Sequence, residues 1–133
     1  SLEALRLAQR VAPQAEYVLL HAFEVPFEGK LRYAGVEENA LASLRVNARR
    51  EATAKMNELV AAAGADENRV RRIVVHGEAT TQVLEHEQAQ DCDLIVIGKR
   101  GQGLIGEMLL GSVTKHILAQ SAGDVLVADR AGA

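Results

Sequence analysis

The feature that most constrains how this chain can fold is the alternation of four short apolar runs with segments of helical spacing. The runs occupy residues 17–23, 70–76, 94–97 and 125–128. They are rich in Val, Leu and Ile and do not alternate cleanly with polar residues. Strands in parallel sheets have this composition because helices cover both of their faces. The runs therefore predict a parallel sheet in an α/β protein.

Helical spacing fills the segments between these runs. The longest helix is indicated by an apolar stripe that ends before Gly64, a residue type that often terminates helices. The stripe consists of Leu41, Leu44, Ala48, Ala52, Met56, Leu59 and Ala63. The other helices are predicted over residues 2–12, 81–89 and 111–120. Pro13 ends the first of them, and Thr80 or Thr81 is expected to cap the second.

The predicted order of elements is a helix followed by a strand, four times over. Such alternation implies right-handed crossovers and an open, doubly wound parallel sheet with helices on both faces. Residues 1–133 have the size of one domain and contain no internal repeat or linker. A domain of this kind normally opens with a strand, whereas this sequence opens with a helix. We therefore expect a strand ahead of Ser1 and interpret the domain as N-terminally incomplete.

One long stretch, residues 23–36, has no predicted regular structure and carries Pro26, Gly29 and Gly35. It follows the carboxyl end of a predicted strand, which is the edge where open α/β sheets bind ligands. Irregular stretches of this length are commonly functional. A lid over a ligand and a simple surface excursion are both compatible with it.

Composition excludes several classes of function. With a formal net charge of −3 the chain has no surplus of Lys and Arg, so nucleic-acid binding is not expected. No apolar run of about 18 residues and no leader sequence is present, so membrane association is not expected either. Cys92 is the one cysteine, which excludes an internal disulfide and favours plain packing over redox chemistry. A cytoplasmic location fits this composition best.

The segment most informative about function is residues 93–115, where a buried strand runs into a glycine-rich loop that returns to a helix. Glycines let backbone N–H groups approach a ligand closely. The helix that begins near Gly111 offers unpaired N–H groups and the positive end of its dipole. Ser112 adds a hydroxyl there, and Lys99 and Arg100 add positive charge. Together these features predict a phosphate-binding site.

Three glycine patterns can be compared with this segment. Gly101, Gly103 and Gly106 spell the dinucleotide pattern G-x-G-x-x-G, which also needs an acidic residue at the end of the next strand. Asp124 has nearly the right spacing but stands at the start of that strand, on the wrong edge. The phosphate loop G-x-x-x-x-G-K-[ST] fails because Ser112 occupies the position of its lysine.

The third pattern, G-x2-G-x9-G-[ST], fits in full through Gly98, Gly101 and the pair Gly111-Ser112. On these residues the chain resembles the ATP-binding branch of the universal stress protein family. The likeness continues in residues 17–22, 109–114 and 124–128, and it covers essentially the whole chain.

The resemblance implies a site for ATP or AMP, and Mg²⁺ can accompany the phosphates. The glycine-rich loop would wrap the ribose and the phosphates, the start of the following helix would bind phosphate oxygens, and backbone near Ala22 would contact adenine. The implied nucleotide-binding residues are Ala22, Ile97, Gly98, Lys99, Arg100, Gly101, Gln102, Gly103, Gly111, Ser112, Val113 and Thr114. No catalytic residue and no protein ligand to a metal is implied.

The resemblance also implies the strand order 3-2-1-4-5, in which the first strand is central and carries an aspartate near the adenosine. That strand would precede Ser1, so no residue of this sequence fills the role of the aspartate. Without the strand, a gap is expected between the strand that begins at Tyr17 and the strand that begins at Leu94.

The histidines are less informative about function than the glycine-rich segment. His21 lies in an apolar run and is interpreted as a hydrogen-bonded core residue, while His76 at a strand end could line the site. His86 is expected on a solvated helix face. His116 follows Ser112 by four residues, but a helix cap or phosphate ligand explains Ser112 better than an activated nucleophile does. The histidines also lack the close spacing of a zinc site.

The function that these features predict is a nucleotide-binding, regulatory universal stress protein. A nucleotide-independent dimeric interaction protein and a slow ATPase are the alternatives. A homodimer is expected through the edge strand from Val125 to Ala128, because an unpaired apolar edge invites pairing with a second copy. Arg45, Arg49 and Arg50, beside the apolar stripe, are interpreted as a solvated face.

Overall fold

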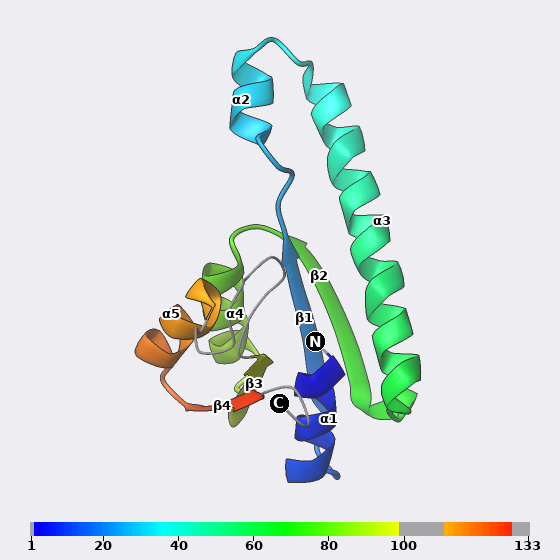
Figure 1. The fold of residues 1–133 in the computed structure, drawn as a ribbon, viewed down its shortest axis with the longest axis vertical. Coiled ribbons are helices and arrows are strands. Elements are labelled where there is room, and N and C mark those ends of the chain that lie inside the picture. Colours follow the sequence, from blue (N-terminus) through cyan, green and yellow to red (C-terminus); the bar gives the residue numbers. More distant parts are fainter. Residues whose placement is uncertain (1, 99–110, 129–133) are drawn as a thin grey trace.

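Figure 1 shows the computed structural model of the chain, which describes residues 2–98 and 111–128. Its elements are α1 (Leu2–Val11), β1 (Tyr17–Phe23), α2 (Glu28–Tyr33), α3 (Glu38–Ala63), a 3₁₀ turn (Glu67–Arg69), β2 (Val70–His76), α4 (Ala79–Ala89), β3 (Leu94–Gly98), α5 (Ser112–Gln120) and β4 (Asp124–Ala128). All four predicted strands are present, and each lies within one residue of its predicted bounds.

The described strands form two parallel pairs. β1 pairs with β2 from Tyr17 opposite Val70 onward, and β3 pairs with β4 from Leu94 opposite Asp124 onward. This confirms the α/β class and the parallel pairing. Among the described residues β1 and β3 belong to separate two-stranded sheets. The two pairs agree with the 3-2 and 4-5 neighbours of the predicted order, but the described strands do not test the complete order.

Helices pack on both pairs of strands. α1 packs on β3 and β4, α3 packs on β1 and β2, and α4 contacts β1 and α5. The largest fully buried side chains are Leu41, Val60 and Ile117. Burial of each such side chain stabilises the fold by about 1.5–3 kcal/mol relative to leaving it exposed. The other buried apolar residues are Ala4, Leu5, Phe23, Val25, Ala52, Met56 and Ala128.

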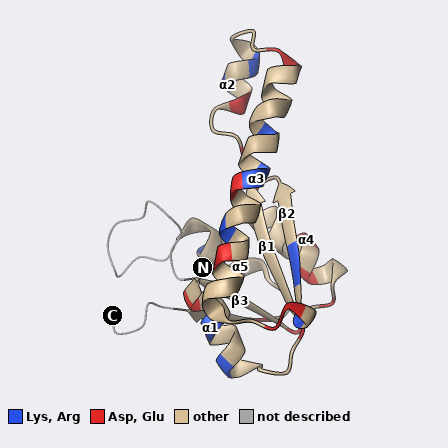
Figure 2. Cartoon of the chain, turned by 90° about the vertical axis from the view of Figure 1, so that its right-hand side faces the viewer, with Lys and Arg blue, Asp and Glu red and all other residues tan. Residues whose placement is uncertain are grey.

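Helix α3 is longer than the strands that it covers. Its N-terminal half and α2 extend beyond β1 and β2, as Figures 1 and 2 show. Gly64 caps its C-terminus with a left-handed φ of 62°, as the sequence predicts. The predicted apolar stripe is buried at Leu41, Ala52 and Met56, but Leu44 is exposed.

The prediction that residues 23–36 are irregular is wrong in its central part, which forms α2. This helix has no buried residue, so its sequence carries no apolar stripe to reveal it. Two residues with positive φ flank it, Phe27 at 60° and Gly35 at 94°. Its place depends on polar contacts, which periodicity does not report.

His21 is not the buried core residue that the sequence predicts, because its side chain is exposed on β1. The prediction assumed a strand inside a continuous sheet. Among the described residues β1 pairs only with β2, and the face of β1 that carries His21 is open to solvent.

The interpretation of the α3 arginines as a solvated face holds for Arg49 and Arg50, which are exposed, but Arg45 is only partly exposed. Arg45 forms an ion pair with Glu28 of α2. The guanidinium of Arg49 donates to the carbonyl oxygen of Val74 at 2.5 Å and lies 5.3 Å from the ring centroid of Phe23. The sequence could not reveal these contacts because the partners come from other elements.

Candidate functional site

The end of β3 and the start of α5 are tied together by one side chain. The hydroxyl of Thr114, in the first turn of α5, donates to the carbonyl oxygen of Gly98 at 2.7 Å. Thr114 is buried, and Gly98 is the last residue of β3, opposite Ala128 of β4. The first turn of α5 is therefore held against the carboxyl edge of the β3–β4 pair, which is where an open α/β sheet binds ligands.

The start of α5 presents backbone donors. Its N-cap is Gly111, which makes no side-chain capping hydrogen bond. The first bond of the helix runs from the N–H of Lys115 to the carbonyl oxygen of Gly111 at 3.0 Å. The N–H groups of Ser112, Val113 and Thr114 precede that bond, so they have no partner inside the helix. Ser112 is exposed and Val113 is partly exposed, so this end is suited to an anion.

Helix α4 provides an internal comparison because it also starts at a carboxyl edge, just after β2. Its N-cap is Glu78, not Thr80 or Thr81 as the sequence predicts. The Glu78 carboxylate accepts from the N–H of Thr80 at 3.0 Å and from the N–H of Thr81 at 2.8 Å. The backbone and hydroxyl donors of Thr81, followed by the backbone donor of Thr80, lower the pKa of Glu78 to about 2. The protein's own carboxylate therefore already occupies this helix start.

The structure brings some of the predicted site residues together. Gly98 and the first turn of α5 are in contact through Thr114, and Ile97 immediately precedes Gly98 on β3. Ala22 lies in the other pair, on β1 opposite Val75. The remaining predicted residues lie outside the described ranges: Lys99, Arg100, Gly101, Gln102 and Gly103.

A polar cluster that sequence reasoning missed lies at the carboxyl edge of β1 and β2. The Glu28 carboxylate on α2 accepts from Nε of Arg45 at 2.5 Å and from Nε2 of His76 at 3.2 Å. The ring of His76 also meets the ring of Phe23 edge-on, with centroids 5.5 Å apart. His76 thus lies at the predicted edge. The one signal in the sequence was its position next to Gly77.

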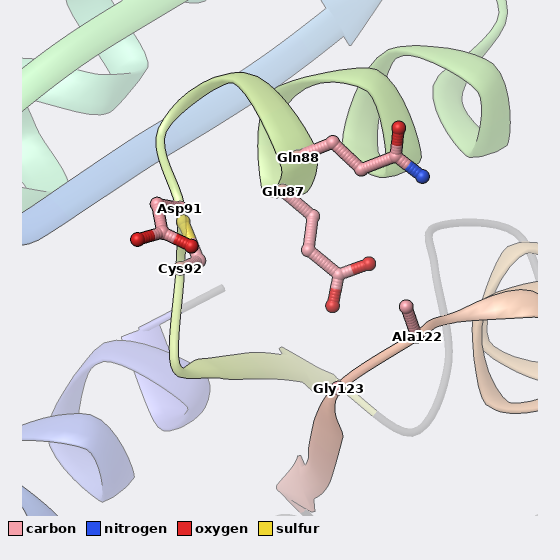
Figure 3. A pocket seen from close by; sticks show the side chains of 6 residues that line it. All are labelled: Glu87, Gln88, Asp91, Cys92, Ala122 and Gly123. Carbon is pink, nitrogen blue, oxygen red and sulfur yellow. The ribbon is translucent and has the colours of Figure 1, made fainter.

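A hollow of about 220 Å³ lies at the opposite, amino-terminal edge of β3 and β4. Figure 3 shows the residues that line it, which are Glu87, Gln88, Asp91, Cys92, Ala122 and Gly123. Its carboxylates would repel a phosphate. Burial, followed by the charges of Glu87, Asp93 and Asp91, raises the pKa of Cys92, which keeps it a thiol. The hollow is therefore not a nucleotide site.

Other kinds of site find little support in the part of the chain that the structure describes. Within residues 2–98 and 111–128, no group of three His, Cys, Asp or Glu side chains could hold a metal ion. No hydrogen bond joins Ser112 to His116 across the same residues. His86 is bonded through Nδ1 to the carbonyl oxygen of Gln82 at 2.8 Å. None of the described helices is both long enough and apolar enough to span a bilayer.

Replacing Thr114 by Val is expected to lower the free energy of unfolding by about 1–3 kcal/mol, because a carbonyl group loses its donor in a buried place. The side chains have nearly the same shape, so lost packing cannot explain the change. Urea unfolding measures the effect, and Thr114→Ser, which keeps the hydroxyl, serves as control. A Thr114→Val variant as stable as the wild-type protein would show that the contact between α5 and Gly98 is dispensable.

Comparison with known proteins now identifies the fold. Universal stress protein MJ0577 from Methanocaldococcus jannaschii is 32% identical over 62 residues, which span 47% of this chain and 38% of that protein. A solved structure of MJ0577 superposes with a TM-score of 0.78 at 24% identity and covers 99% of this chain and 88% of its own. The structure of a universal stress protein in complex with cAMP superposes with a TM-score of 0.57 at 26% identity. The match covers 97% of this chain and 87% of that protein's chain. The universal stress protein family itself matches over residues 1–129, so this chain belongs to that family.

Proposed function

We propose that this protein is a nucleotide-binding regulatory module that holds ATP or AMP at the carboxyl edge of β3. The proposal rests on the difference between the N-termini of helices α4 and α5. At α4 the first-turn N–H groups bind the side chain of the cap residue Glu78, whereas the cap residue of α5, Gly111, has no side chain that could bind them. The first-turn N–H groups of α5 and the dipole of that helix favour a phosphate group at Ser112, Val113 and Thr114.

The rest of the proposed site follows the glycine pattern. Gly98 and the residues Lys99 to Gly103 would hold the ribose and phosphates through backbone and positive charge, and backbone near Ala22 would meet adenine. Mg²⁺ would accompany the phosphates of the nucleotide. The structure of a related protein in complex with cAMP supports an adenine nucleotide as the ligand class.

Titration calorimetry with ATP, AMP and adenosine tests the proposal. The phosphate contacts at α5 predict that both nucleotides bind and that adenosine binds much more weakly, since it lacks the group that the N–H groups hold. Equal affinities for adenosine and AMP would show that the phosphate group does not contribute to binding. Absence of heat with all three ligands would defeat nucleotide binding altogether.

A homodimer is the second part of the proposal. β4 pairs with β3 on one side, and no described strand pairs with its other side. An apolar edge of this kind can pair with the same edge of a second copy. Sedimentation velocity at micromolar concentration should report a species of twice 14.3 kDa. A monomer alone would contradict the dimer without affecting nucleotide binding. A dimer that binds no nucleotide would instead favour the alternative, a nucleotide-independent interaction protein.

Any ATP hydrolysis should be slow. Of the described residues, Ser112 carries an exposed hydroxyl at the start of α5, and no hydrogen bond to a described base activates it. Phosphate release well above background, abolished in Ser112→Ala, would establish an ATPase instead. A cytoplasmic site of action completes the proposal, because free ATP and AMP are its ligands.

A further inference from the structure

The carboxylate of Glu28 is the point where three elements meet. It lies on α2 and contacts Arg45 of α3 and His76 at the end of β2. Arg32, one turn further along α2, approaches it within 4.0 Å. Although it is charged, the Glu28 side chain is only 15% exposed, so solvent screens these contacts less than it screens a surface ion pair.

Few other polar contacts join α2 to the rest of the described chain. The helix has no buried residue. Its other link to α3 is the ion pair between Arg32 and Glu38, with Nε and Oε1 2.6 Å apart. Those two side chains are 49% and 67% exposed, so their pair contributes little. Among the described polar contacts, the attachment of α2 therefore depends mainly on Glu28.

The backbone on either side of α2 suits a segment that moves as a unit. Phe27 before it and Gly35 after it both adopt positive φ, which breaks the regular chain at each end. Val25, two residues before Phe27, is buried and anchors the incoming chain. Beneath the segment, the buried ring of Phe23 lies between His76 and Arg49 at the carboxyl edge of β1 and β2.

We propose that residues 28–35 form a strap that the Glu28 carboxylate holds closed over the carboxyl edge of β1 and β2, and that opens when Glu28 releases Arg45 and His76. The contact between Glu28 and His76 lies at the end of β2, opposite the end of the strand that carries Ala22. Control of nucleotide entry by the strap rests on the proposed function, whereas the opening of the strap does not.

Acid should open the strap. Desolvation raises the pKa of Glu28, but the hydrogen bond and charge of Arg45, and then those of His76, lower it more, so the pKa lies below its usual value. The carboxylate therefore holds the strap fully above the usual glutamate pKa, and the hold is lost as the pH falls through the lowered value. The charged or titratable groups that face the carboxylate are Arg32 on α2, Arg45 on α3 and His76 on β2.

Hydrogen exchange of the nucleotide-free protein tests the strap. Glu28→Gln keeps the shape of the side chain and removes its charge. Exchange of the α2 amides at Leu31, Ala34 and Gly35 is expected to rise about tenfold or more, the scale of losing one hydrogen bond to a charged group. Exchange in β1 and β2 should stay unchanged. Unchanged exchange in α2, or an equal rise across β1 and β2, would overturn the proposal.

Two further variants make this test specific. Arg45→Gln removes the α3 partner of Glu28 and should reproduce the hydrogen-exchange pattern of Glu28→Gln. Glu37→Gln removes the same charge at the N-cap of α3, where the side chain makes no capping bond, and should leave α2 unchanged. A Glu37→Gln variant that exchanges as fast as Glu28→Gln would show an effect of net charge and overturn the strap.

Stopped-flow association of ATP tests control of entry. Glu28→Gln should raise the association rate constant several-fold, because the strap no longer has to open first. An unchanged rate constant in a variant whose α2 exchanges faster would overturn control of entry. If the wild-type protein does not bind ATP, the proposed function fails, while the exchange experiment still decides whether the strap exists.

Discussion

Replacing Ser112 by Asp is expected to abolish ATP binding while leaving the fold at least as stable as before. Ser112 is exposed in the first turn of α5, where an acidic side chain favours the helix by about 0.3–1 kcal/mol. The same carboxylate would stand beside the bound phosphate. Two like charges about 4 Å apart at an effective dielectric constant of about 20 repel by about 4 kcal/mol, which is about a thousandfold in affinity.

Calorimetry with ATP and thermal unfolding, measured on the same preparations, separate the two effects. Ser112→Asn is the matched control, because it has nearly the same shape as Asp without the charge, and it should retain most of the affinity. Affinity lost together with stability would point to damage of α5 instead. Wild-type affinity in Ser112→Asp would mean that the phosphate binds elsewhere.

The largest effect on stability is expected at Ile117, on the buried face of α5. Its side chain is 0% exposed. Ile117→Ala removes buried methyl groups and leaves a cavity, so the free energy of unfolding should fall by about 2–5 kcal/mol. That is a large share of the about 5–15 kcal/mol that stabilises a typical domain. Because α5 carries the proposed phosphate site, ATP affinity should fall as well.

Leu118 offers a matched control at the next position of the same helix, since it is 43% exposed. Leu118→Ala should change the free energy of unfolding by no more than about 0.5 kcal/mol, the usual range for a surface substitution. Urea unfolding of both variants is the measurement. Equal losses at the two positions would mean that α5 is not seated as described.

The strands could be predicted closely from the sequence, because burial on both faces produces continuous apolar runs. The helices α1, α3, α4 and α5 could be predicted because their spacing or their glycine ends are local signals. Helix α2 could not, since it buries no residue and is held by Glu28 through partners 17 and 48 residues away. Such contacts depend on tertiary structure, which no local pattern encodes.

The candidate site, like the fold, could be predicted only in part. Gly98, Gly111 and Ser112 follow a fixed spacing, so the sequence predicts their strand-loop-helix setting. The bond between Thr114 and Gly98 could not be predicted, because it depends on how the helix is seated against the strand. The cap of α4 was assigned to a threonine because Ser, Thr, Asp and Asn are the usual caps, whereas the structure uses Glu78.

Titration of ¹⁵N-labelled protein with AMP, followed through the backbone amide signals, tests the central claim most directly. The amide signals of Ser112, Val113 and Thr114 should move and saturate together, since these N–H groups are the ones that receive the phosphate. The amide signals of Thr80 and Thr81 should stay in place, because the Glu78 carboxylate already holds them. Stationary signals at the start of α5 at saturating AMP would contradict the account.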